Sequence, residues 1–223
     1  MFRRLILIIL ALLSILIPVI TSGCEPPPQG SAEWYFAQAS KLASEGNYTE
    51  AINNYSDAIR VEPLMAKLYV NRAATYEMIG NYDAAIADCN KALSLESDLP
   101  LAYINLAYAD NSKGNYNQAI QDSNKAIQLN SKLAQAYINR AYAYNQTGET
   151  YKSIADCNEA LEIDPNLADG YYHRAVAYMA IDKTDEAIAD FQKFISLSTN
   201  KTLIDAANQE ISKLSAPTTQ TTP

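Results

Sequence analysis

The segment from residue 66 to residue 99 reads AKLYVNRAATYEMIGNYDAAIADCNKALSLESDL. Small and apolar side chains recur in it at helical spacing both before and after Gly80, which predicts two helices joined by a turn. Gly80 follows the first helix, where a left-handed backbone costs glycine little, and Asp83 places a negative charge near the start of the second. The side chains expected to face inward are Leu68, Tyr69, Arg72, Ala73 and Tyr76, then Ala85, Ile86, Cys89, Ala92, Leu93 and Leu95.

The same arrangement returns along the chain at one fixed interval, the step from Gly46 to Gly80. A fixed period of roughly 20–50 residues is typical of a solenoid, in which no unit buries its apolar face alone and neighbours stack to share a core. Three series of residues keep the period: Gly46, Gly80, Gly114 and Gly148; Tyr35, Tyr69, Tyr103, Tyr137 and Tyr171; and Ala58, Ala92, Ala126 and Ala160.

At these positions the sequence resembles the tetratricopeptide repeat (TPR), a helix–turn–helix unit of about 34 residues. The resemblance covers five consecutive units, at residues 32–65, 66–99, 100–133, 134–167 and 168–201. It implies an all-α fold, an α-solenoid of five such units. The last unit would leave an apolar face bare, and residues 202–216 carry apolar side chains at helical spacing, so they are expected to form a C-terminal capping helix. Residues 217–223, rich in Thr and Pro, are expected to be a disordered tail.

The N-terminus has the order of a secretory signal. A short basic segment is followed by an apolar run, Leu5–Ile17, and by small residues up to Gly23, so residues 1–23 are expected to be a signal peptide. The residues 21–24, TSGC, resemble the lipobox of bacterial lipoproteins, which implies that Cys24 is lipidated. With Cys24, the Pro-rich residues up to 31 form a stiff spacer. The alternative is an uncleaved anchor helix. Either way the protein is expected to be exported and membrane-anchored, in the cell envelope of a bacterium.

The composition argues against several classes of function. The chain has 17 Lys and Arg against 25 Asp and Glu, a formal net charge of −8, so a nucleic-acid reader is not expected. Three Cys and one His are too few for a disulfide scaffold. No metal, cofactor or small-molecule substrate is indicated. Cys89 and Cys157 occupy equivalent positions two units apart and are expected to be buried free thiols.

Charged side chains also follow the period. Each arginine of the series Arg72, Arg140 and Arg174 can pair with an aspartate of the series Asp88, Asp122, Asp156 and Asp190. The interpretation is that these are structural ion pairs, because no general base or convergent pocket accompanies them.

The sharpest functional signal is a series of amides. Asn71, Asn105 and Asn139 are each separated by one repeat, at a position that His173 continues, and the TPR resemblance implies that it faces the inner groove. A carboxamide can both donate to and accept from an extended backbone, which suits a bound peptide. The alternative is that these amides bond only across neighbouring helices. An apolar and aromatic stripe is expected beside them: Phe36, Val70, Ile104, Ile138 and Tyr172, with Tyr108 and Tyr142 one turn further on.

The function that follows is a non-enzymatic adaptor, tethered to a membrane, that binds a peptide or protein segment in its groove. A second hypothesis is a scaffold subunit of an envelope assembly or secretion complex, held by its convex face or edges. A third, more remote, is a hydrolase of the cell envelope.

Mass spectrometry of the mature N-terminus is expected to find a chain that begins at Cys24 and carries lipid, because small residues precede Cys24 and a Pro-rich spacer follows it. The Cys24→Ala variant should then lose both processing and lipid. A chain beginning at Met1, or a variant that is still processed and membrane-bound, would contradict lipoprotein maturation.

Overall fold

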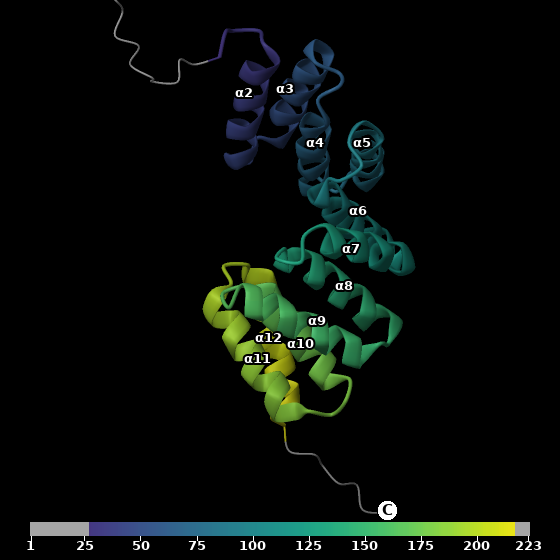
Figure 1. Cartoon of the computed structure of the whole chain (residues 1–223). Coiled ribbons are helices and arrows are strands. Elements are labelled where there is room, and N and C mark those ends of the chain that lie inside the picture. Colours follow the sequence, from purple (N-terminus) through teal and green to yellow (C-terminus); the bar gives the residue numbers. More distant parts are fainter. Residues whose placement is uncertain (1–26, 217–223) are drawn as a thin grey trace, which may run out of the picture.

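The computed structural model describes residues 27–216, and in this range it contains helices and no strands (Figure 1). The predicted signal peptide, Cys24, the start of the predicted spacer and the predicted tail at 217–223 lie outside the described residues. None of the helices in the described range is both long and apolar enough to cross a membrane. The helices are α2 (Ala32–Ser44), α3 (Tyr48–Val61), α4 (Ala66–Met78), α5 (Tyr82–Leu95), α6 (Pro100–Lys113), α7 (Tyr116–Leu129), α8 (Ala134–Thr147), α9 (Thr150–Ile163), α10 (Ala168–Met179), α11 (Thr184–Leu197) and α12 (Lys201–Leu214).

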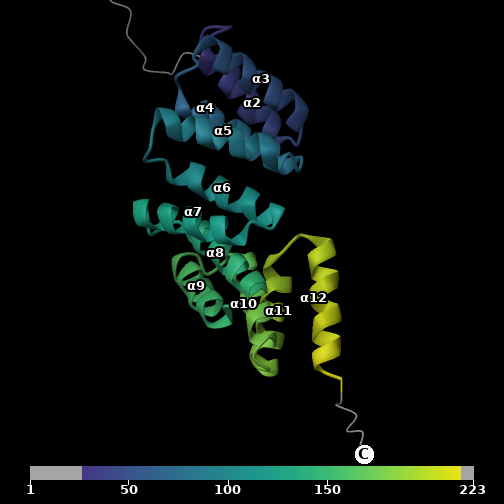
Figure 2. The ribbon, with the colours of Figure 1, turned by 90° about the vertical axis from the view of Figure 1, so that its right-hand side faces the viewer.

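The helices from α2 to α11 form five helix–turn–helix pairs that stack in chain order from one end of the molecule to the other (Figure 1). The last helix, α12, lies beside α11 at the C-terminal end (Figure 2). The predicted all-α solenoid of five units with a C-terminal capping helix is therefore confirmed over the described range.

The turn inside each pair needs a left-handed residue. Four pairs use the glycines of the periodic series, with φ between 73° and 81°. The fifth pair has Asp182 at this point, with φ of 57°. Aspartate is one of the few residues other than glycine that tolerates this conformation, and so the period continues where its glycine is missing.

Alanines let the helices approach closely. Ala73 on α4 and both Ala85 and Ala92 on α5 are completely buried, in one cluster with Ala102 and Ala109 of α6. The core of one unit therefore continues into the next, as stacking requires. Cys89 is buried in the same cluster, and Cys157 is buried two units later; both are free thiols, as the sequence predicted. Burial raises both thiol pKa values, that of Cys157 to about 12.

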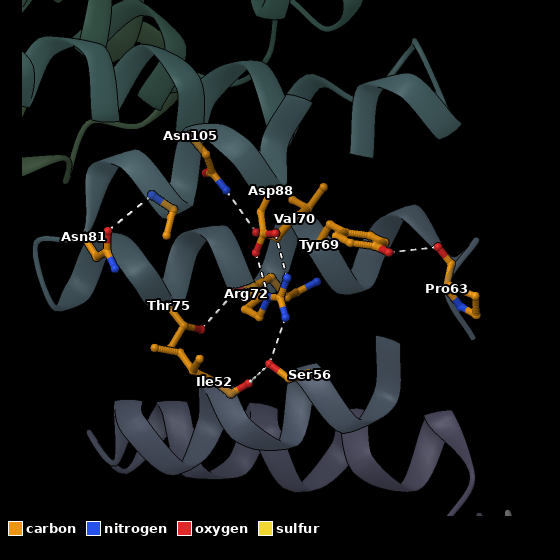
Figure 3. A network of polar contacts seen from close by, with 12 residues as sticks. Ile52, Ser56, Pro63, Tyr69, Val70, Arg72, Thr75, Asn81, Asp88 and Asn105 are labelled. Carbon is orange, nitrogen blue, oxygen red and sulfur yellow. Dashed lines mark hydrogen bonds and ion pairs between the residues drawn. The ribbon is translucent and has the colours of Figure 1, made fainter. Parts of the chain in front are cut away.

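A repeated arginine ties the second, fourth and fifth pairs to the pair that precedes each of them, as Figure 3 shows for Arg72. Arg72 on α4 donates from Nε and Nη2 to the two carboxylate oxygens of Asp88 on α5, at 2.7 and 2.8 Å, and from Nη1 to Ser56 Oγ on α3, at 2.8 Å. Such bidentate pairs fix geometry as well as charge. The interpretation of structural ion pairs is confirmed, and each arginine chooses the aspartate of its own unit. The equivalent pairs are Arg140–Asp156 and Arg174–Asp190.

The third unit lacks this clamp. Leu106 stands at the arginine position and is buried in the core. The aspartate of the third unit, Asp122, accepts a hydrogen bond from Gln118 instead, at 3.1 Å. Burial without a cationic partner raises the pKa of Asp122 to about 6.

The helix α12 covers the open face of the fifth unit. Ala207 is completely buried against Phe191 and Phe194 of α11. The apolar face of α12 that packs on this cluster consists of Leu203, Ile204, Ile211 and Leu214, all partly buried.

Removal of residues 202–223 is expected to lower the melting temperature by about 10 °C and to promote association. The four apolar side chains are partly buried, and full burial of a Leu or Ile contributes about 1.5–3 kcal/mol. The matched control is a chain that lacks only residues 217–223, which should melt like the full-length protein. Equal melting of all three chains, measured by circular dichroism, would show that α12 is not docked.

Candidate ligand-binding face

The first helices of the five units form one layer of the molecule. In this layer α4, α6, α8 and α10 each contact the first helix of the preceding unit, whereas the second helices contact only their neighbours in chain order. In a curved stack of two layers the more closely spaced layer lies on the inner side. We refer to the surface formed by α2, α4, α6, α8 and α10 as the inner face.

The amide series lies on the inner face, but its members do not behave alike. Asn105 donates from Nδ2 to the carbonyl oxygen of Val70 on α4 at 3.2 Å, and Asn139 donates to that of Ile104 on α6 at 3.0 Å. Asn71 instead donates within its own helix, to the carbonyl oxygen of Lys67 at 2.7 Å. Asn105 and Asn139 thus follow the alternative that the sequence left open, since they join neighbouring helices.

A second amide series, which sequence reasoning missed, points the other way along the stack. Asn111 on α6 donates to the carbonyl oxygen of Asn139 on α8 at 2.7 Å, and Asn145 on α8 donates to that of His173 on α10 at 2.9 Å. The sequence feature that could have revealed this series is the spacing of Asn111 and Asn145, which is one full repeat period. Together the two series cross-link the first helices in both directions.

Glu77 occupies the second amide position in the second unit, one repeat before Asn111. Glu77 makes no side-chain hydrogen bond to a backbone carbonyl among the described residues, and its Oε1 is buried without a hydrogen-bond partner there. Burial raises the pKa of Glu77 to about 8. The equivalent acceptor, the carbonyl oxygen of Asn105, receives no side-chain hydrogen bond in the part of the chain that the structure describes.

The expected apolar stripe is partly core, and the structure corrects this part of the sequence interpretation. Val70 and Ile104 are each 7% exposed and pack between helices. Ile138 is 2% exposed and reaches the inner face only at the wall of a cavity. The rings at the two ends of the stripe are half-buried, Phe36 against Tyr55 and Tyr172 against Phe191 and Phe194.

Two tyrosines do stand on the inner face. Tyr108 on α6 is 43% exposed and Tyr142 on α8 is half-buried. Each ring packs edge-on against the tyrosine that begins the second helix of the preceding unit, Tyr82 for Tyr108 and Tyr116 for Tyr142, with ring centroids 6.3 and 6.2 Å apart. These edge contacts hold the two rings in fixed positions.

Between α6, α8 and α10 the inner face contains a cavity of about 260 Å³. Five of the eleven groove residues predicted from the sequence line it: Tyr108, Ile138, Asn139, Tyr142 and His173. Its other lining residues are Asp169, which the sequence placed among the few charges of the groove, and Asn111, Ser112 and Gln135, which it did not assign there. Asn71 lines a separate hollow between the first two units, and the remaining predicted residues line neither.

Few charged groups line the cavity. Burial lowers the pKa of His173 to about 4, so the imidazole is neutral at pH 7 and can both donate and accept. Asp169 is exposed at the first turn of α10 and carries the one formal charge in the lining. No group of three or more His, Cys, Asp or Glu able to hold a metal ion occurs in the described range.

Stacked helix–turn–helix units with an amide-linked inner layer define an α-solenoid whose inner face is open to a ligand. Family models described as "Tetratricopeptide repeat" match residues 66–99 and 134–167, 101–133, and 157–189. Together they span more than half of the chain, which belongs to the tetratricopeptide-repeat family. A search of the curated proteins found no match.

Several solved structures share the fold. TTC0263, a thermophilic TPR protein in Thermus thermophilus, is 18% identical with a TM-score of 0.69, over 81% of this chain and 99% of that one. MamA from Desulfovibrio magneticus RS-1 is 19% identical with a TM-score of 0.64, over 76% and 96%. YrrB, described as a TPR protein with an unusual peptide-binding site, is 20% identical with a TM-score of 0.58, over 80% and 92%. At these identities the likeness establishes the fold.

The Glu77→Asn variant is expected to be more stable than the wild type at pH 9, by about 1–3 kcal/mol, because it removes a buried unsatisfied acceptor and restores the repeated amide. The folded protein raises the pKa of Glu77 from its ordinary value of 4.5 to about 8. The wild type should therefore lose stability as the pH rises through this window, and the variant should lose less, because the contribution of Asp122, whose pKa is raised to about 6, remains. Urea unfolding at pH 5, 7 and 9 measures the difference.

The matched control is Glu159→Gln, at an exposed carboxylate on α9, which should keep the pH dependence of the wild type. Parallel stability curves for the wild type and Glu77→Asn would mean that Glu77 ionises freely in the folded protein.

Proposed function

We propose that this protein is an adaptor that binds an extended segment of a partner protein along its inner face. The observation that carries the proposal is the cavity between α6, α8 and α10, flanked by the fixed rings of Tyr108 and Tyr142. TPR proteins act through protein–protein contacts, and the peptide-binding site described for YrrB supports a peptide ligand here.

The cavity has room for one side chain of a bound segment. Its volume is about 260 Å³, just below the range of about 300–1,000 Å³ that is typical of pockets for drug-sized ligands. The backbone of such a segment would continue along the inner face. Tyrosines are effective in such contacts, since each combines a large apolar ring with a polar tip.

Membrane tethering is part of the proposal. It is supported by the order of residues 1–31: a basic start, an apolar run, small residues before Cys24, and a Pro-rich spacer. In this arrangement the lipid on Cys24 fixes the position of the protein in a bacterial envelope. The spacer sets how far from the membrane the repeats can reach, and the inner face selects the partner.

A specific observation favours the scaffold function as a second candidate. Val61 and Leu64, at the turn between α3 and α4, are 46% and 77% exposed and border a shallow apolar hollow. Exposed apolar side chains in a contiguous group are typical of protein contacts. A scaffold subunit would use this edge and leave the inner face free.

The Tyr108→Ala variant is expected to weaken partner binding at least ten-fold, about 1.4 kcal/mol, because it removes an exposed ring beside the cavity. The control is Tyr151→Ala, at a tyrosine on α9 that is 75% exposed. The measurement is crosslinked pull-down with the full-length protein from native membranes, with the partner quantified by mass spectrometry. Loss of the partner in a third variant, Leu64→Ser, with retention in Tyr108→Ala, would reject the inner face and favour the scaffold.

A further inference from the structure

The cavity between α6, α8 and α10 is lined by an acidic group that has no ion-pair partner among the described residues. Asp169 is exposed on the first turn of α10, and it forms no ion pair with any of residues 27–216, whereas the buried aspartates Asp88, Asp156 and Asp190 each bind an arginine. No lysine or arginine lines the cavity. The carboxylate of Asp169 is therefore free to meet a charge that comes from outside the protein.

A second, independent feature is an unused acceptor. Asn111 is only 6% exposed, and its Nδ2 donates a hydrogen bond to the carbonyl oxygen of Asn139 at 2.7 Å. Its Oδ1 is buried and receives no hydrogen bond from the described part of the chain. An unsatisfied buried acceptor costs about 1–3 kcal/mol, and Asn111 lines the cavity. A ligand that brings a hydrogen-bond donor removes that cost.

The remaining walls suit a cation. Tyr108 and Tyr142 bring two aromatic rings to the lining, and the faces of such rings attract positive charge. His173 adds no competing positive charge, because it is neutral at pH 7. The formal net charge of −8 on the whole chain favours the approach of a basic ligand and disfavours an acidic one.

We propose that this cavity binds the guanidinium group of an arginine side chain in the partner segment. Arginine presents five donors in a planar group, which can reach a carboxylate and an amide oxygen together while it stacks on an aromatic ring. Asp169 supplies the charge, Asn111 Oδ1 the buried acceptor, and Tyr108 and Tyr142 the aromatic surface. The inference rests on the proposed function and adds the chemistry of the residue that is recognised.

The experiment selects ligands from a phage-displayed library of random dodecapeptides, with the full-length protein in detergent micelles as bait. The baits are the wild type, Asp169→Asn and the control Glu159→Gln, which removes the same charge from an exposed position on α9. Because Asp169 is exposed and unpaired, its substitution should leave the fold intact, which circular dichroism checks. Peptides from the wild type and the control should be enriched in arginine, and those from Asp169→Asn should not.

A selected peptide is then synthesised with arginine and with citrulline, its neutral isostere. The wild type should bind the citrulline peptide at least ten-fold more weakly, and Asp169→Asn should distinguish the two peptides less than three-fold. Selected peptides without arginine enrichment, or equal affinities for the two peptides in the wild type, would overturn the guanidinium site and leave the peptide-binding function standing. Failure of the wild type to select any peptide would overturn both.

Discussion

One pair of helices in this fold cannot bury its own apolar face, and this constraint makes the units stack. The completely buried alanines of α4 and α5 share a cluster with those of α6, so each unit completes the core of its neighbour. The arginine clamps add direction, because Arg72 holds Asp88 of its own unit and Ser56 of the preceding one. Stacking must also end, and α12 ends it by covering the last apolar face.

This constraint separates two kinds of position on the inner face. Positions that repeat, such as Asn105 and Asn139, are occupied by hydrogen bonds to the backbone of the neighbouring helix, because every unit needs the same spacing. At other positions the residue type changes from unit to unit. Residues 67, 101, 135 and 169 share one position, are all exposed, and are occupied in turn by Lys67, Leu101, Gln135 and Asp169. Ligand specificity is expected to come from the positions whose residue varies between units.

The helical pattern and the fixed repeat period were sufficient to predict the helix pairs, their order and the capping helix. The candidate site was predicted only in part. Tyr108, Tyr142 and His173 do line the cavity, but Val70 and Ile104 are core. Helical spacing shows that a residue lies on a given face of its helix. It does not show whether that face lies open or beneath a neighbouring helix, which here belongs to the adjacent unit.

The amino-acid sequence was enough to define the all-α solenoid, the unit length and the placement of the turns, because these follow from local helix geometry and from a repeated need to bury apolar faces. The packing of the units determines which amides donate to a neighbouring helix and which buried acceptors receive no hydrogen bond. Whether a buried polar atom finds a partner depends on how closely α4, α6 and α8 approach one another, and Asn111 Oδ1 and Glu77 Oε1 have none among the described residues. That approach depends on the curvature of the stack. Curvature is the sum of many small packing differences between units, and no single residue encodes it.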